Sequence, residues 1–129
     1  MVDNDPRLKL WAIAVKGYTD IEINAPTAKQ DWKQVLTLAQ QLSDMKWSNR
    51  AHGELGIITF LESDWKRGAW LVGKAFFEAS SAADIGSEIR YLQFLGAGLN
   101  EVNRQSEAAC LLGYWLPQTM YALFSSKTE

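Results

Sequence analysis

The residues with reactive side chains are few and poorly grouped for chemistry. His52 and Glu54 are two positions apart, so on a helix they point in different directions and do not make a His-Glu-x-x-His zinc pair. Cys110 is the single cysteine, and His52 is the single histidine with which it could act as a nucleophilic pair. We therefore expect no catalytic residue, no metal site and no cofactor. Cys110 is interpreted as a buried structural thiol and His52 as a partly exposed helix residue.

Other catalytic patterns are also missing from the sequence. It contains no Gly-x-Ser-x-Gly, no phosphate-binding P-loop and no dinucleotide fingerprint. Gly96 and Gly98 sit within a helical pattern and do not follow a strand, which argues against a phosphate loop. Carboxylate pairs such as Glu88 with Glu101 are typical of a solvated helical face. The sequence predicts that this protein is not an enzyme.

Length and charge limit the class of protein. The chain has 129 residues, which suits one domain over 1–129. It has 13 Lys and Arg against 15 Asp and Glu, so it lacks the excess of positive charge that is typical of a nucleic-acid-binding protein. No stretch approaches the roughly 18 apolar residues of a membrane span, and the single cysteine suits a reducing compartment. We expect a cytoplasmic protein with no nucleic-acid or membrane partner, and a fragment of a longer protein stays an open alternative.

Apolar residues recur at helical spacing along most of the chain. They predict six helices, over 7–22, 28–43, 49–62, 64–79, 85–102 and 104–124. Thr27, Ser48 or Asn49, Ser63 and Asp84 are the expected N-caps of the second to fifth helices.

Two segments have a competing strand interpretation. Residues 18–23 alternate in polarity and could form a short strand, which the pattern leaves open. Residues 55–61 are apolar and β-branched and could form a buried strand. For this second segment we favour the helix, because its flanking segments are helical and no partner strand is visible.

Small residues recur at a fixed spacing. Gly17, Gly56 and Gly96 are separated by 39 and 40 residues, and Gly56 lies twelve residues before Gly68, as Gly96 does before Ala108. A small residue on each of two antiparallel helices lets their backbones approach where they cross. Gly costs about 1 kcal/mol against Ala inside a helix, so its recurrence indicates close crossings.

At these residues the sequence resembles the tetratricopeptide-repeat (TPR) family, which has a Leu-Gly in its first helix and an Ala-rich second helix. Leu55-Gly56 supplies the first feature, and the resemblance covers 49–116 well and 7–43 poorly. The period is about 40 rather than about 34, Gly68 replaces the usual Ala, and Trp115 stands where a small residue is expected. The resemblance implies an all-α fold of three antiparallel hairpins, near 7–43, 49–79 and 85–124, stacked as a short right-handed α-solenoid.

The resemblance also implies a concave face lined by the first helix of each hairpin. The side chains expected to contact a partner on this face are Arg50, Phe60, Arg90, Gln93, Asn100 and Glu101. The polar row of Arg90, Gln93 and Asn100 suits a peptide backbone or a carboxylate. A plain solvated face is the alternative interpretation.

The predicted last helix is apolar around too much of its circumference for one packing stripe. Solenoid ends normally carry a polar cap, because each unit buries its neighbour. We therefore expect this helix to mediate a homodimer or to dock against another element. The residues expected to be covered are Trp115, Met120, Tyr121 and Phe124.

The leading functional hypothesis is a non-catalytic scaffold that binds a protein or peptide, because the visible pattern serves helix packing. The alternative is a small-ligand sensor or regulatory domain, possibly part of a longer signalling protein. The reason for this alternative is the excess of aromatic residues, with six Trp, five Phe and four Tyr.

Overall fold

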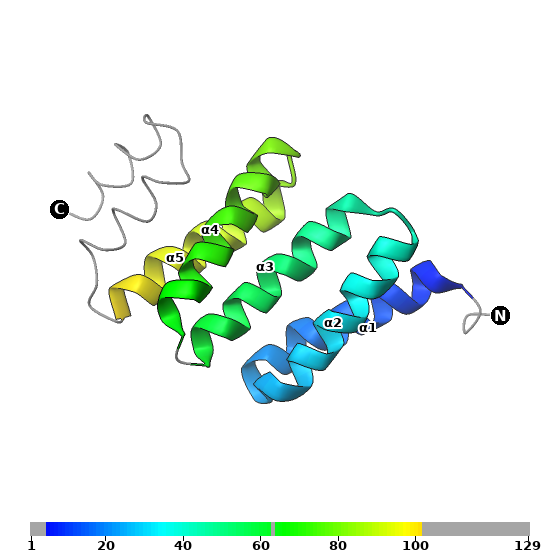
Figure 1. The fold of residues 1–129 in the computed structure, drawn as a ribbon, viewed down its shortest axis with the longest axis horizontal. Helices are drawn as coiled ribbons and strands as arrows, with labels where there is room; N and C mark the ends of the chain where they lie inside the picture. The colour runs from blue at the N-terminus through cyan, green and yellow to red at the C-terminus, as the bar shows by residue number, and fades with distance from the viewer. Residues whose placement is uncertain (1–4, 63, 102–129) are drawn as a thin grey trace.

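The computed structural model describes residues 5–62 and 64–101, and this part of the chain is all-α. Its helices are α1 (Pro6–Ile23), α2 (Ala25–Gln41), α3 (Met45–Leu61), α4 (Trp65–Ser81) and α5 (Ile85–Glu101) (Figure 1). The all-α prediction is confirmed for these residues. The predicted helix 104–124, with Cys110, Trp115, Met120, Tyr121 and Phe124, lies outside them.

Both ambiguous segments are helical. Residues 18–23 continue α1, so the short-strand alternative is wrong. The buried positions of α1 are Leu10, Ala14, Gly17 and Ile21, whose spacing of four, three and four is that of one helix face. Residues 55–61 belong to α3, as predicted.

Two helices begin earlier than their predicted caps. The side chain of Asn24 accepts the backbone N–H of Thr27 at 3.2 Å, so Thr27 lies in the first turn of α2. Asp44 accepts the N–H of the third residue of α3 at 3.1 Å, so Ser48 and Asn49 lie inside that helix. Short Asn and Asp side chains satisfy these unpaired N–H groups and thereby move each helix start toward the N-terminus.

The turns between the helices repeat the same features at regular intervals along the sequence. Asp44, Asp64 and Asp84 each immediately precede a helix and are spaced twenty residues apart. The α2–α3 and α4–α5 turns each place a non-glycine residue in the left-handed region, Ser43 at φ 54° and Ala83 at φ 57°. In both turns the next N–H donates to the carbonyl five residues earlier, a Schellman arrangement. The chain is thus built from a repeating helical hairpin of about forty residues, consistent with a solenoid-like bundle.

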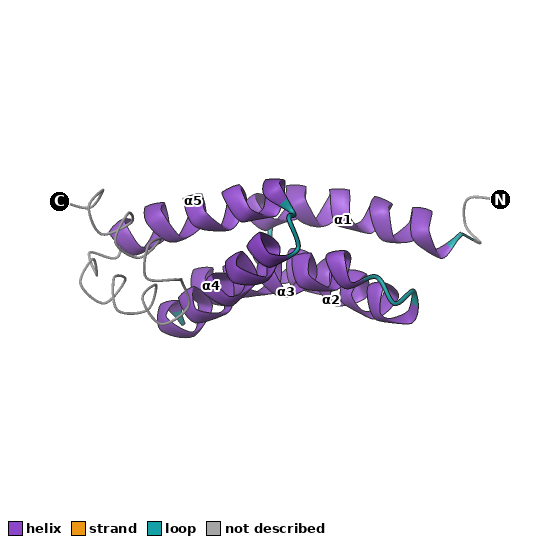
Figure 2. Cartoon of the chain, turned by 90° about the horizontal axis from the view of Figure 1, so that it is seen from above, coloured by secondary structure: helices purple, strands orange, loops and turns teal. Residues whose placement is uncertain are grey.

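The helices lie in two layers, and α3 belongs to the layer of α2 and α4. Figure 2 shows α1 and α5 on one side of the molecule and α2 and α4 on the other. Helix α3 packs mainly against α2 and α4 and makes a smaller contact with α5. The largest wholly buried side chains are Trp32, Tyr91, Phe76, Leu10, Ile58 and Leu95. None of the described helices is long and apolar enough to cross a membrane.

The predicted close crossing of α3 and α4 is present. A Cβ atom added at Gly56 would lie 2.9 Å from Leu71 Cβ, and one added at Gly68 would overlap the backbone of Phe60. At Gly17 an added Cβ would lie 2.8 Å from Nε1 of the buried Trp32. These glycines are needed because the neighbouring helix occupies the space of a side chain.

Replacing Gly68 by Ala tests this crossing. The overlap with the Phe60 backbone should lower the free energy of unfolding by about 1–3 kcal/mol, outweighing the gain of about 1 kcal/mol in helix propensity. Gly86→Ala is the matched control, because no described atom lies within 4 Å of the added methyl group. Urea denaturation should show opposite shifts for the two variants. Stabilisation by both would contradict the close crossing.

Candidate functional site

A buried carboxylate lies where three helices meet. The Glu54 side chain on α3 is 0% exposed, and Arg90 on α5 binds both of its oxygens. Nε of Arg90 donates to Oε2 at 2.8 Å and Nη2 donates to Oε1 at 2.6 Å. The guanidinium carbon also lies 5.1 Å from the ring centre of Tyr18 on α1. This arrangement joins α1, α3 and α5.

A second ion pair connects α3 to the start of α5. Arg50 donates from Nε and Nη2 to the two oxygens of Asp84, each at 2.8 Å. The guanidinium of Arg50 holds the pKa of the Asp84 carboxyl at about 2, below its ordinary 3.8. The carbonyl of Arg50 accepts the hydroxyl of Tyr91 at 3.0 Å. Both arginines therefore serve mainly to attach α5 to α3.

The buried Tyr91 and the half-buried Tyr18 are poor proton donors at neutral pH. Burial raises the pKa of Tyr18 to about 12 and raises the pKa of Tyr91 as well. Both hydroxyls therefore stay protonated, and the neighbouring carboxylates are occupied by arginine. The arrangement stabilises helix packing and does not resemble a general acid–base site.

An apolar groove of about 740 Å³ lies between α1, α3 and α5. We call it the apolar groove, and its lining is Ile21, Glu22, Ile57, Leu61, Gly86, Ile89, Arg90, Gln93 and Phe94. Leu61 and Ile89 remain 54% and 50% exposed, respectively. The groove therefore presents unburied hydrocarbon bordered by a few polar groups.

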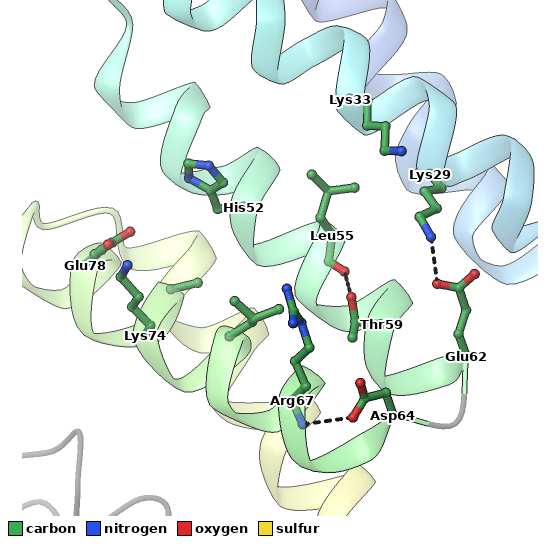
Figure 3. Close-up of a pocket in the computed structure, with 12 residues that line it drawn as sticks. Lys29, Lys33, His52, Leu55, Thr59, Glu62, Asp64, Arg67, Lys74 and Glu78 are labelled. Carbon is green, nitrogen blue, oxygen red and sulfur yellow. Dashed lines mark hydrogen bonds and ion pairs between the residues drawn. The ribbon is translucent and has the colours of Figure 1, made fainter.

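A second groove, of about 570 Å³, lies between α2, α3 and α4. We call it the basic groove, and its lining is Lys29, Lys33, His52, Leu55, Thr59, Glu62, Asp64, Arg67, Leu71, Lys74, Ala75 and Glu78 (Figure 3). Its basic side chains come from α2 on one wall and α4 on the other.

Only some of the charged side chains in the basic groove form ion pairs or hydrogen bonds with one another. Lys29 Nζ binds Glu62 at 3.2 Å, and Asp64 accepts the backbone N–H of Arg67 at 3.4 Å. Lys33 and the guanidinium of Arg67 make no ion pair with any described residue. These two cations are thus available to an external anion.

The structure places only some of the residues predicted for a concave face at the apolar groove. Arg90 and Gln93 line the apolar groove. Phe60 is only 8% exposed and packs edge-on against a neighbouring ring, so the structure places it in the core. Asn100 is exposed but lines neither groove. Glu101 ends α5, and its side chain lies outside the described part of the chain.

His52 is exposed and borders the basic groove, as a partly exposed helix residue should be. In the described part of the chain, no three side chains of His, Cys, Asp or Glu are grouped to hold a metal ion.

The sequence interpretation missed the basic groove. Lys29 and Lys33 are four residues apart on α2, and Arg67 and Lys74 are seven apart on α4, so each pair lies on one helix face. That spacing was the available signal. The spacing alone does not predict a groove, because it does not show that α2 and α4 lie on either side of α3.

No family model, curated protein or solved structure matched this chain when it was compared with them.

The Arg50–Asp84 pair predicts a specific dependence of stability on pH. Because folding lowers the pKa of Asp84 from 3.8 to about 2, the pair stabilises the fold above about pH 4 and loses this contribution between pH 4 and 2. Asp84→Asn keeps a good capping residue but removes the charge. The stability difference between wild type and this variant should shrink across that window in urea unfolding experiments.

Arg50→Met removes the cause of the shift and should abolish the same pH-dependent difference. A difference between wild type and Asp84→Asn that stays constant from pH 5 to pH 2 would contradict the assignment.

Proposed function

We propose that this protein is a non-catalytic interaction module that binds an apolar peptide segment of a protein partner in the apolar groove. The supporting observation is that Leu61 and Ile89 remain 54% and 50% exposed at the groove. The partly buried Phe94 and the buried Ile21 and Ile57 complete its apolar lining. Helical proteins commonly bind peptides by burying such a strip against an apolar face of the ligand.

The border of the groove supplies hydrogen-bonding groups. Gln93 is exposed and makes no hydrogen bond with a described residue, so its amide is available to a peptide backbone. Glu22 lies on the opposite wall, from α1. Arg90 is held by Glu54 and acts mainly as a rigid part of the wall. Apolar contacts would supply the affinity, and Gln93 would orient the bound segment.

The proposal includes a six-helix, right-handed TPR-like solenoid. Its support is the repeat of forty residues seen in the turns at Ser43 and Ala83. It also includes docking through residues 104–124, either as a homodimer or against another element, because the sequence of that segment is strongly apolar. A cytoplasmic location is proposed because a single cysteine suits a reducing compartment.

Peptide display with the whole protein as bait tests the proposed function. Selected peptides should contain apolar residues and should bind Ile89→Asp at least about tenfold more weakly, because burial of Ile contributes about 1.5–3 kcal/mol. Ile85→Asp is the matched control, since Ile85 is 66% exposed on the same helix but does not line the groove. Fluorescence polarisation should show affinity within about twofold of wild type for this control. Unchanged affinity in Ile89→Asp, or failure to select any peptide, would refute the proposed groove.

A further inference from the structure

The basic groove lies on the opposite side of α3 from the apolar groove. His52, Leu55 and Thr59 follow one another at intervals of three and four and line the basic groove. Ile57 and Leu61 are four apart and face the apolar groove. Residues three or four apart share a helix face, so α3 serves as a common wall with two binding surfaces.

Basic side chains reach the groove from both of its walls. Figure 3 shows Lys29 and Lys33 coming from α2, and Arg67 and Lys74 coming from α4. Between them lies hydrocarbon from Leu55 and Leu71. The groove therefore combines separated positive charges with an apolar floor.

The carboxylates that line this groove neutralise the charge of only some of its basic side chains. Glu62 is paired with Lys29, and Asp64 caps α4 through the N–H of Arg67. Glu78 lies at the end of the groove occupied by Lys74. Lys33 and Arg67, on opposite walls, have no carboxylate partner among the described residues, although the whole chain carries a net charge of -2.

Figure 3 shows Lys33, Arg67 and Lys74 at different places along the groove, and this spread favours an extended ligand over a compact anion. Lys33, Arg67 and Lys74 are all exposed, so solvent screens each charge and each contributes little alone. A single phosphate would need converging donors. A chain with several carboxylates can instead meet the two walls at successive positions, and its apolar side chains can cover Leu55 and Leu71.

We infer that the basic groove binds an acidic peptide segment in which apolar residues are interspersed with Asp or Glu. A volume of about 570 Å³ is enough for the side chains of a short segment. Charge complementarity would accelerate association and select acidic partners. The inference does not depend on the apolar groove, because the two surfaces share only the backbone of α3.

Fluorescence polarisation with a labelled peptide of alternating Glu and Leu tests this inference. The folded full chain should bind it, and a peptide with Gln in place of Glu should bind at least tenfold more weakly. Lys33→Glu and Arg67→Glu should each weaken binding about three- to fivefold at low salt, because each reversal replaces a weak attraction by a weak repulsion. Affinity should fall as salt is raised, because exposed charges are screened.

Lys9→Glu is the matched control for the charge reversals. Lys9 is exposed on α1, lines neither groove and makes no ion pair with a described residue. This variant should bind the acidic peptide within about twofold of wild type. Ile89→Asp should also bind it normally, which separates this site from the apolar groove.

Three results would overturn the inference. One is equal binding of the Gln peptide, which would show that charge is not recognised. Another is an equal loss of affinity in Lys9→Glu and Lys33→Glu, which would show a general charge effect. The third is displacement of the peptide by inorganic phosphate at the peptide's own affinity, which would indicate a site for a single compact anion. Circular dichroism on each variant establishes that it is folded before its binding is compared.

Discussion

The burial of the Glu54 carboxylate restricts how α5 lies against α3. Removing an ionised carboxylate from water costs several kcal/mol unless a cation and hydrogen bonds replace its hydration. Arg90 supplies both through two short hydrogen bonds, while the Glu54 side chain remains 0% exposed. Only a narrow range of positions of α5 over α3 satisfies this geometry. The pair thus restricts the orientation of α5 relative to α3, and the packing of α4 against both helices supplies most of the contact.

Small residues make that orientation possible. A Cβ atom at Gly53 would overlap the Tyr91 ring, so the absence of a side chain there lets α5 settle on α3. The Tyr91 hydroxyl then reaches the carbonyl of Arg50. About one turn further along α3, Gly56 and its neighbour Gly68 on α4 let α4 come close. Helix α3 is therefore held between two neighbours, and each of its two faces forms the base of a groove.

The two grooves differ because the flanking helices bring different side chains. Helices α1 and α5 bring Ile21, Ile89 and Phe94 to one face of α3, whereas α2 and α4 bring four Lys and Arg side chains to the other. The aromatic excess of the sequence is only partly explained by core packing. Trp32 is wholly buried, but Trp11 and Trp70 remain 45% and 38% exposed.

Local spacing in the sequence is enough to predict the five described helices and the approximate repeat. The apolar period and the recurrent glycines act within one helix or between adjacent helices. The cap predictions at Thr27, Ser48 and Ser63 are wrong, because the side chains of Asn24, Asp44 and Asp64 accept the first free N–H groups. Tertiary structure alone decided the surfaces. Phe60 and Arg50 could not be recognised as packing residues, nor Lys33 and Arg67 as opposing walls, because those roles depend on which helix faces which across α3.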